Sequence, residues 1–181
     1  MDAVTVTELC NVVNFVATFG GLALLSCAGR KTIMVFMNIV MAGILFTVGL
    51  AIMYEWNTVT VICILSFIAA FEFSSGPITW LYMSEIMQDK AVSIATVLNW
   101  LVTLVVSAIT PSITTPESNI PYIFMTVGFL TICGAIFMTI FMKETKGKSQ
   151  NEIADLYVVD KELTQMKRKV ITDRDDYGFS P

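Results

Sequence analysis

Long apolar runs separated by short polar interruptions make up the first 142 residues of the chain. They cover about residues 4–28, 32–54, 59–85, 91–110 and 120–142. Each run has about the 20 predominantly apolar residues that a helix needs to cross a bilayer. A segment inside lipid must satisfy its own backbone hydrogen bonds, so each run is predicted to be helical. The predicted fold class is therefore an all-α membrane protein with five transmembrane helices.

The runs differ in how polar side chains are distributed within them. The second run is almost uniformly apolar, with Asn38 as its one strongly polar interior residue, and this pattern predicts a helix that faces lipid. In the fourth run, polar side chains recur every three or four residues, which places them on one helix face. They are Ser93, Thr96, Asn99, Thr103 and Ser107.

The third run contains a carboxylate, Glu72, near its middle. An acid at that depth costs about 2.5–3.5 kcal/mol on insertion scales and normally faces a bundle interior or a wet cavity. Gly76 and Pro77 follow and predict a break in the helix, which is tolerated at that depth only against protein or water. Two serines lie between Glu72 and Gly76, and Trp80 follows shortly after Pro77. This stretch therefore predicts part of a binding site.

Charge is sparse and unevenly placed. The chain of 181 residues is 55% hydrophobic and 14% charged, with a net charge of −4 and a mean hydropathy of +0.72. Its basic residues fall at Arg30 and Lys31, at Lys90, and from Lys143 onward. Five spans put all of these on one side, which the positive-inside rule makes cytoplasmic, so the N-terminus is expected on the other side.

The tail, residues 143–172, differs in character from the spans and is predicted to be cytoplasmic. Ser149 and Glu152 have the spacing of a capping box, and apolar residues then recur at helical spacing to about residue 169. This predicts an amphipathic helix over 150–169, resting either on the protein's own inner face or on a separate partner. Residues 173–181 are polar and are predicted to be disordered.

The sequence argues against several other classes of function. It has no histidine, no nucleophile–base arrangement, no phosphate loop and no metal-ligand cluster, so neither an enzyme nor a cofactor is expected. The four cysteines are scattered through apolar runs, where cysteine acts as a small hydrophobic residue. Nucleic-acid binding is not expected either, because the basic residues are few and are mixed with acids in the tail.

Four motifs together resemble those of the sugar porter family of the major facilitator superfamily. They are Gly29-Arg30-Lys31, Gly76-Pro77-Ile78-Thr79-Trp80, Asn99-Trp100 and Glu144-Thr145-Lys146-Gly147. Their order and spacing agree along roughly residues 5–155. The chain is therefore similar to the C-terminal part of a glucose-transporter-like protein, spans eight to twelve.

The resemblance implies a set of residues that line a sugar cavity: Asn14, Glu72, Trp80 and Asn99. Amides and carboxylates bond sugar hydroxyls, and an indole offers a flat apolar face to the ring. Glu72 is the hardest of the four to explain without a role in binding, whereas each of the other three has a rival interpretation. The two asparagines could bond across helices instead, and Trp80 could be an interface anchor.

The resemblance also places Arg30 and Glu85 in a charge network that closes the cytoplasmic gate. The sequence departs from the family pattern around that network. Ser26-Cys27 replace an acidic residue and an arginine, Lys143 replaces a proline, and the loop over 86–90 is shortened and lacks an arginine. These departures predict a weakened latch at the cytoplasmic end.

Two functional hypotheses follow. In the first, the chain is the C-terminal portion of a hexose transporter that works by alternating access, with the missing N-terminal half-bundle needed to complete it. Passive transport and proton symport both remain open. In the second, it is a transport-inactive truncated homologue that serves as a structural membrane subunit of a larger complex. Either way a multi-pass protein is expected, in a plasma membrane rather than an organelle membrane.

Overall fold

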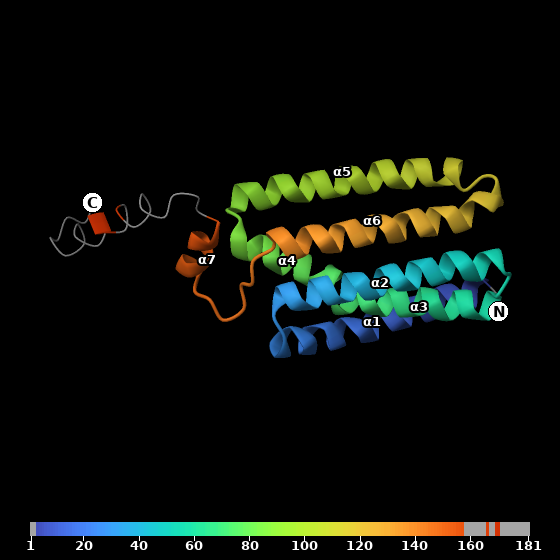
Figure 1. The fold of residues 1–181 in the computed structure, drawn as a ribbon, viewed down its shortest axis with the longest axis horizontal. Helices are drawn as coiled ribbons and strands as arrows, with labels where there is room; N and C mark the ends of the chain where they lie inside the picture. The colour runs from blue at the N-terminus through green and yellow to red at the C-terminus, as the bar shows by residue number, and fades with distance from the viewer. Residues whose placement is uncertain (1–2, 158–165, 167–168, 171–181) are drawn as a thin grey trace. The chain divides into compact units, whose positions relative to one another are not determined.

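The computed structural model describes residues 3–157, 166 and 169–170. They divide into two compact units, Met1–Lys146 and Gly147–Pro181. The first unit holds six α-helices and one short 3₁₀ helix (Figure 1). These are α1 (Ala3–Cys27), α2 (Arg30–Met53), α3 (Asn57–Phe73), α4 (Ser75–Ile86), α5 (Asp89–Ile113), η1 (Glu117–Asn119) and α6 (Ile120–Phe141).

Five stretches of this unit are helical, long enough and apolar enough to cross a membrane. They are Val4–Leu25, Arg30–Met53, Asn57–Ile86, Asp89–Ile113 and Glu117–Phe141. Such helices can close all their backbone hydrogen bonds within themselves, which a segment in lipid requires. The prediction of an all-α membrane fold with five spans is confirmed.

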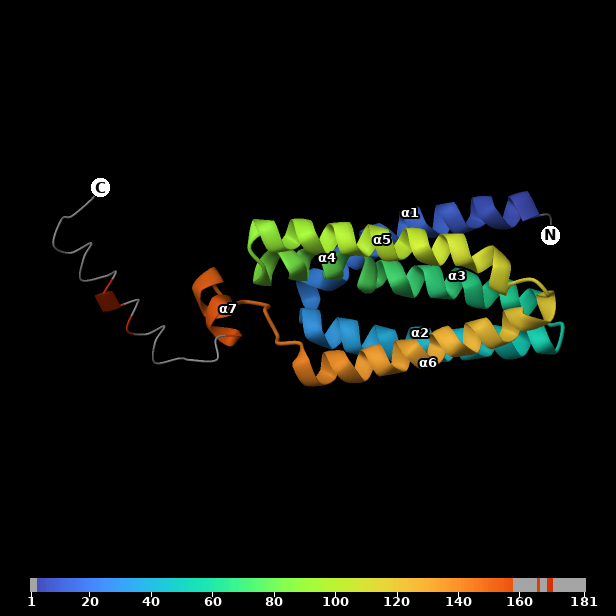
Figure 2. The same cartoon turned by 90° about the horizontal axis from the view of Figure 1, so that it is seen from above.

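Helix α2 is the centre of the bundle. It packs mainly against α6 on one side and α3 on another, and α1 packs against the far side of α3 (Figures 1 and 2). Eight residues of this predicted lipid-facing run are buried, Asn38 among them, whereas Phe36 and Leu50 are exposed, so only part of its surface can face lipid. Apolar residues suit lipid and helix contacts equally, so a uniformly apolar run does not distinguish the two.

The third span is broken into two helices at Ser74, whose φ of −137° and ψ of −87° are not helical. The break lies just before the predicted Gly76-Pro77 pair. Pro77 is the third residue of α4, a position in the first helical turn that needs no backbone N–H. A continuous helix would instead bring its ring against the carbonyl of Phe73, so the interruption falls ahead of the proline.

Helix α5 is the most exposed part of the first unit. None of its 25 residues is buried, and its main contacts are with α4. Pro111 lies inside its last turn. An apolar helix with no covered face requires lipid or another protein around it.

The second unit contains α7 (Gln150–Leu156). Ser149 caps it, with its side chain accepting from the Glu152 N–H and the Glu152 carboxylate accepting from the Ser149 N–H at 2.7 Å. This is the arrangement that the sequence predicts. Most of the predicted continuation to residue 169, and all of residues 173–181, lie outside the described residues.

Candidate functional site

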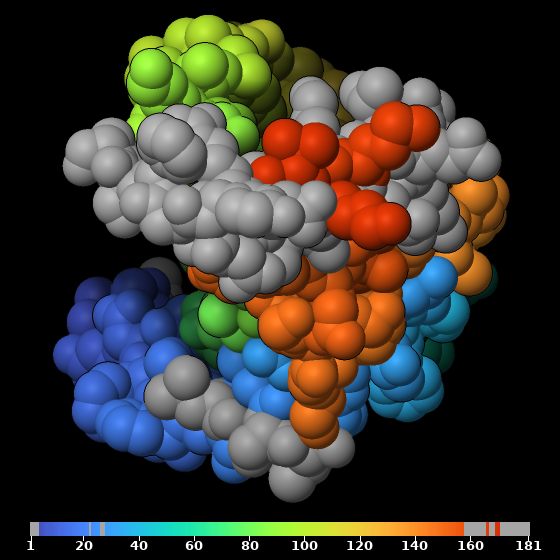
Figure 3. Space-filling view, turned by 90° about the vertical axis from the view of Figure 1, so that its left-hand side faces the viewer, coloured from blue at the N-terminus to red at the C-terminus, as the bar shows by residue number. Residues whose placement is uncertain are grey.

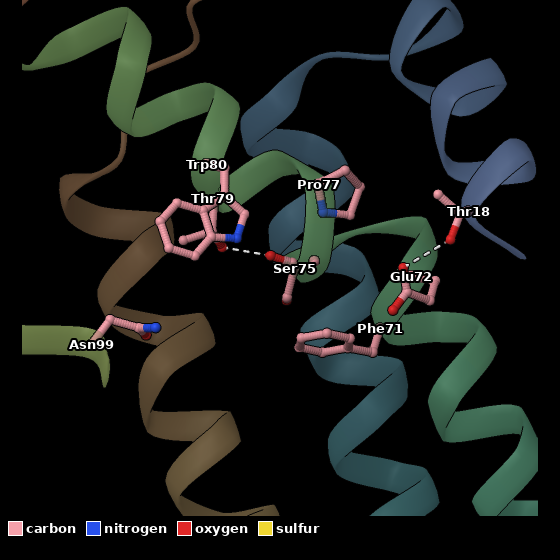
Figure 4. A pocket seen from close by; sticks show the side chains of 9 residues that line it. Thr18, Phe71, Glu72, Ser75, Pro77, Thr79, Trp80 and Asn99 are labelled. Atoms are coloured by element: carbon pink, nitrogen blue, oxygen red, sulfur yellow. Dashed lines mark hydrogen bonds between the residues drawn. The ribbon is translucent and has the colours of Figure 1, made fainter. Parts of the chain in front are cut away.

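A cavity of about 550 Å³ opens beside the break between α3 and α4. Its wall comes from four helices, α1, α3, α4 and α5 (Figure 4), and the cavity is open rather than enclosed. In the space-filling view α1 (blue) and α5 (green) stand apart at the end of the first unit that faces the viewer (Figure 3). The lining residues are Thr18, Phe71, Glu72, Ser75, Gly76, Pro77, Thr79, Trp80 and Asn99.

Glu72 is half-buried in the cavity wall and is held from α1. The Asn14 Nδ2 atom donates to its Oε1 at 2.7 Å, and the Thr18 hydroxyl lies 3.3 Å from its Oε2. Both donors lie one turn apart on α1, which faces the end of α3. The carboxylate is thus bonded to a neighbouring helix, as Figure 4 shows for Thr18, and it also lines the cavity.

Three of the four predicted sugar-binding residues line this one cavity: Glu72, Trp80 and Asn99. Asn14 does not line it and instead bonds the Glu72 carboxylate. The rival interpretation of Asn14 as a helix-bridging amide therefore describes its geometry. Trp80 is 43% exposed and lies on the cavity side of α4 opposite Asn99 (Figure 4).

The cavity wall offers both hydrogen-bond donors and acceptors. The carboxylate of Glu72 can only accept when ionised, whereas the Trp80 indole N–H can only donate. Among the described residues neither the Trp80 Nε1 nor the Asn99 amide has a hydrogen-bond partner. Such a wall can bind a small molecule that carries several hydroxyls.

Thr18 was not identified from the sequence. It lies four residues after Asn14, so the two share one face of α1. The spacing from Asn14 was the one sequence signal that could have identified Thr18 as a second partner of Glu72. A single threonine in an apolar run does not indicate which helix it faces.

A second cluster lies where α1 joins α2 and where α4 and α6 end. The Arg30 Nη2 atom forms an ion pair with Glu85 Oε1 at 3.2 Å, and both side chains are only 19% exposed. Glu85 also accepts a hydrogen bond from the Thr145 hydroxyl. The structure therefore brings together the two residues that the family resemblance assigns to the gate.

Glu144, just beyond α6, completes this cluster. Its carboxylate accepts from the backbone N–H groups of Arg30 at 2.9 Å and Lys31 at 3.1 Å, which begin α2. It also accepts from the N–H groups of Thr145 and Lys146. An acid at a helix N-terminus satisfies free N–H groups and matches the helix dipole, so Glu144 fastens the end of α6 to the start of α2.

Within the part of the chain that the structure describes, no cluster of three or more His, Cys, Asp or Glu side chains could hold a metal ion.

Residues 1–157 match the family described as "Sugar (and other) transporter". The chain is 33% identical over 168 residues to the facilitated trehalose transporter Tret1 of Drosophila erecta, covering 84% of this chain and 19% of that protein. It is 33% identical over 159 residues to the Tret1 protein of Bombyx mori, covering 78% and 30%.

Solved structures agree with these similarities. The inward-open xylose transporter XylE of E. coli superposes with a TM-score of 0.79 at 29% identity, over 84% of this chain and 36% of that one. The proton:xylose symporter XylE bound to 6-bromo-6-deoxy-D-glucose gives a TM-score of 0.78 at 28% identity, over 86% and 35%. The chain spans about a fifth to about a third of the length of these proteins.

Proposed function

The chain belongs to the sugar (and other) transporter family, and we propose that it forms the C-terminal part of a hexose transporter. Its spans make it a multi-pass membrane protein. In this proposal the cavity between α1, α3, α4 and α5 is one half of the sugar site. No covalent chemistry is involved, and the sugar is held by hydrogen bonds and by contact with an aromatic ring.

The observation that carries the proposal is the placement of Glu72. A carboxylate at mid-membrane depth is costly unless it faces protein or water, and here it is oriented by Asn14 and lines an open cavity. Trp80 and Asn99 line the same cavity. Its volume lies in the usual range of 300–1,000 Å³ for ligand sites, and a hexose can both donate to the carboxylate and accept from the indole.

Transport by alternating access needs a second half-bundle that rocks against this one. The uncovered length of α5 and the open side of the cavity leave surface for such a partner. We place the Arg30–Glu85 end on the cytoplasmic side by the positive-inside rule, because Arg30, Lys31 and Lys143 gather there. In that orientation the ion pair would hold the cytoplasmic ends of α2 and α4 together.

Equilibrium binding of D-glucose to the purified chain tests the proposed half-site, and uptake is measured in proteoliposomes that also contain the N-terminal half-bundle. Glu72→Gln should weaken binding by about tenfold or more, since a hydrogen bond to a charged group contributes about 1.5–3 kcal/mol. Trp80→Ala should also weaken binding, because it removes an aromatic face and an indole N–H donor. Matched controls are Glu55→Gln and Trp56→Ala, both exposed at the α2–α3 turn. Unchanged affinity in both site variants would defeat the assignment.

A second candidate function, a transport-inactive structural subunit, is favoured by α5, which has no buried residue and exposes most of its large apolar side chains. Such a surface suits permanent contact with other membrane proteins. Purification in mild detergent separates the two proposals. A stoichiometric assembly with unrelated proteins, together with no glucose binding, would favour the structural role.

A further inference from the structure

Asn38 is a buried amide in α2, behind the wall of the cavity. It is 9% exposed and is one of few buried polar residues described in the chain. Its Nδ2 atom donates to the Met34 carbonyl at 2.8 Å and to the Ser75 hydroxyl oxygen at 3.2 Å. Ser75 lines the cavity at the first position of α4. The amide therefore contacts the cavity only through this serine.

The Met34 carbonyl fixes which way the amide points. A carbonyl oxygen only accepts, so the atom of Asn38 beside it must be the nitrogen. The same nitrogen faces Ser75, so an N–H of Asn38 points at the serine oxygen. Ser75 accordingly accepts from Asn38 and cannot donate its own hydrogen in that direction.

The Ser75 hydroxyl hydrogen has no acceptor among the described residues. Many hydroxyls in these helices bond the carbonyl four residues earlier, as Thr79 does to Ser75 at 2.6 Å and Thr103 to Asn99 at 2.9 Å. For Ser75 that carbonyl belongs to Phe71, across the break at Ser74, where the backbone leaves helical geometry. The hydrogen is left for a molecule in the cavity.

We propose that Asn38 is a positioning residue, which fixes Ser75 as a hydrogen-bond donor to the bound sugar opposite the acceptor Glu72. This deepens the proposed function and rests on it. The site would then have a defined polarity: one sugar oxygen accepts from Ser75, and a different sugar hydroxyl donates to Glu72. Asn38 itself does not touch the sugar.

Sugar analogues measure this polarity directly. Fluorine in place of a hydroxyl can still accept weakly but cannot donate, whereas hydrogen can do neither. Equilibrium binding of the monodeoxy and monodeoxyfluoro derivatives of D-glucose to the wild-type chain should reveal one ring position where the fluoro analogue binds better than the deoxy analogue. At the position that faces Glu72, both analogues should bind equally poorly.

Ser75→Ala should abolish the difference in affinity between the fluoro and deoxy analogues at the ring position where the wild type prefers fluorine. Asn38→Leu should reduce it and weaken glucose binding about two- to tenfold, the range for a neutral hydrogen bond. In the Ser75→Ala background, Asn38→Leu should have no further effect on affinity. Asn11→Leu, at an exposed position of α1, is the matched control.

The outcomes distinguish this inference from the proposed function. If Asn38→Leu weakens glucose binding equally in the wild type and in the Ser75→Ala background, its effect does not pass through Ser75. That result would overturn this inference. If Asn38→Leu does not fold, Ser75→Ala alone decides, since an unchanged fluoro preference overturns the donor role. Wild-type binding of glucose with no fluoro preference at any position overturns this inference alone, whereas no glucose binding by the wild type overturns the proposed function as well.

Discussion

The Nδ2 atom of Asn14 lies 2.7 Å from Oε1 of Glu72 and donates a hydrogen bond to it between α1 and α3. Thr18, one turn further along α1, lies 3.3 Å from the other carboxylate oxygen. Because both oxygens are approached from the same helix, the orientation of the carboxylate depends on where α1 lies. The affinity of the cavity for a guest should therefore depend on residues of α1 that do not line it.

Asn14→Ala should weaken glucose binding by about tenfold, because it removes a hydrogen bond to a charged group. The same substitution in a Glu72→Ala background should change nothing further, since Asn14 acts through that carboxylate. Equilibrium binding measures both. Asn11→Ala, one turn earlier on an exposed face, is the control, and an equal loss there would contradict the prediction.

Gly21→Ala should lower the thermal unfolding midpoint and weaken glucose binding together. A Cβ at Gly21 would collide with the Glu72 carbonyl oxygen and approach the Phe73 Cα to 3.3 Å. Overpacking of this kind costs about 1–3 kcal/mol, which exceeds the gain of about 1 kcal/mol from alanine over glycine in a helix. Gly43→Ala meets nothing within 4 Å and should leave the midpoint unchanged or raise it.

The position of the candidate cavity could be predicted from the sequence because an acid in a membrane span has few explanations. Glu72 and Trp80 are brought to one cavity, and the spacing within their own span was enough to pair them. The partners across helices were not predictable in the same way. Asn38 occupies a run whose apolar residues suit lipid and protein equally, so its contact with Ser75 depends on the packing of α2 against α4. The helix break was predicted near Gly76 and Pro77. It lies at Ser74 because a proline is tolerated in the first turn of a helix, so α4 begins just before Pro77.

Glu144→Gln should reduce the stability of the first unit by about 1–2 kcal/mol, the usual effect of losing a helix cap and its favourable charge. The carboxylate accepts from the backbone N–H groups of Arg30 and Lys31, and glutamine retains one oxygen but not the charge. Thermal unfolding in detergent measures the change. Glu117→Gln, exposed in η1, should have little effect, and equal shifts would contradict the capping role.

The cap of α7 should persist in mildly acidic solution. Hydrogen bonds from the Ser149 backbone and side chain lower the pKa of Glu152 below its ordinary value of 4.5. Because the folded pKa is depressed, the cap stabilises α7 above the ordinary value and is lost as the pH falls through the lowered one. NMR titration of the Glu152 carboxyl carbon should therefore give a midpoint below 4.5. Ser149→Ala removes the side-chain hydrogen bond and keeps the backbone one, so it should return the midpoint only part of the way toward that value. An unchanged midpoint would contradict the contribution of the Ser149 side chain.

Helix α5 touches its neighbours so little that its tilt will be set by the thickness of the hydrocarbon around it. Its apolar run, about residues 91–110, extends about 30 Å at 1.5 Å per residue. That length matches the roughly 30 Å core of a typical bilayer, so α5 should tilt in a thinner bilayer. Asn99 is carried on this helix, whereas Glu72 is held firmly by α1. The width of the cavity will thus vary with lipid chain length, and short-chain and long-chain lipids will yield different sugar affinities for the same protein.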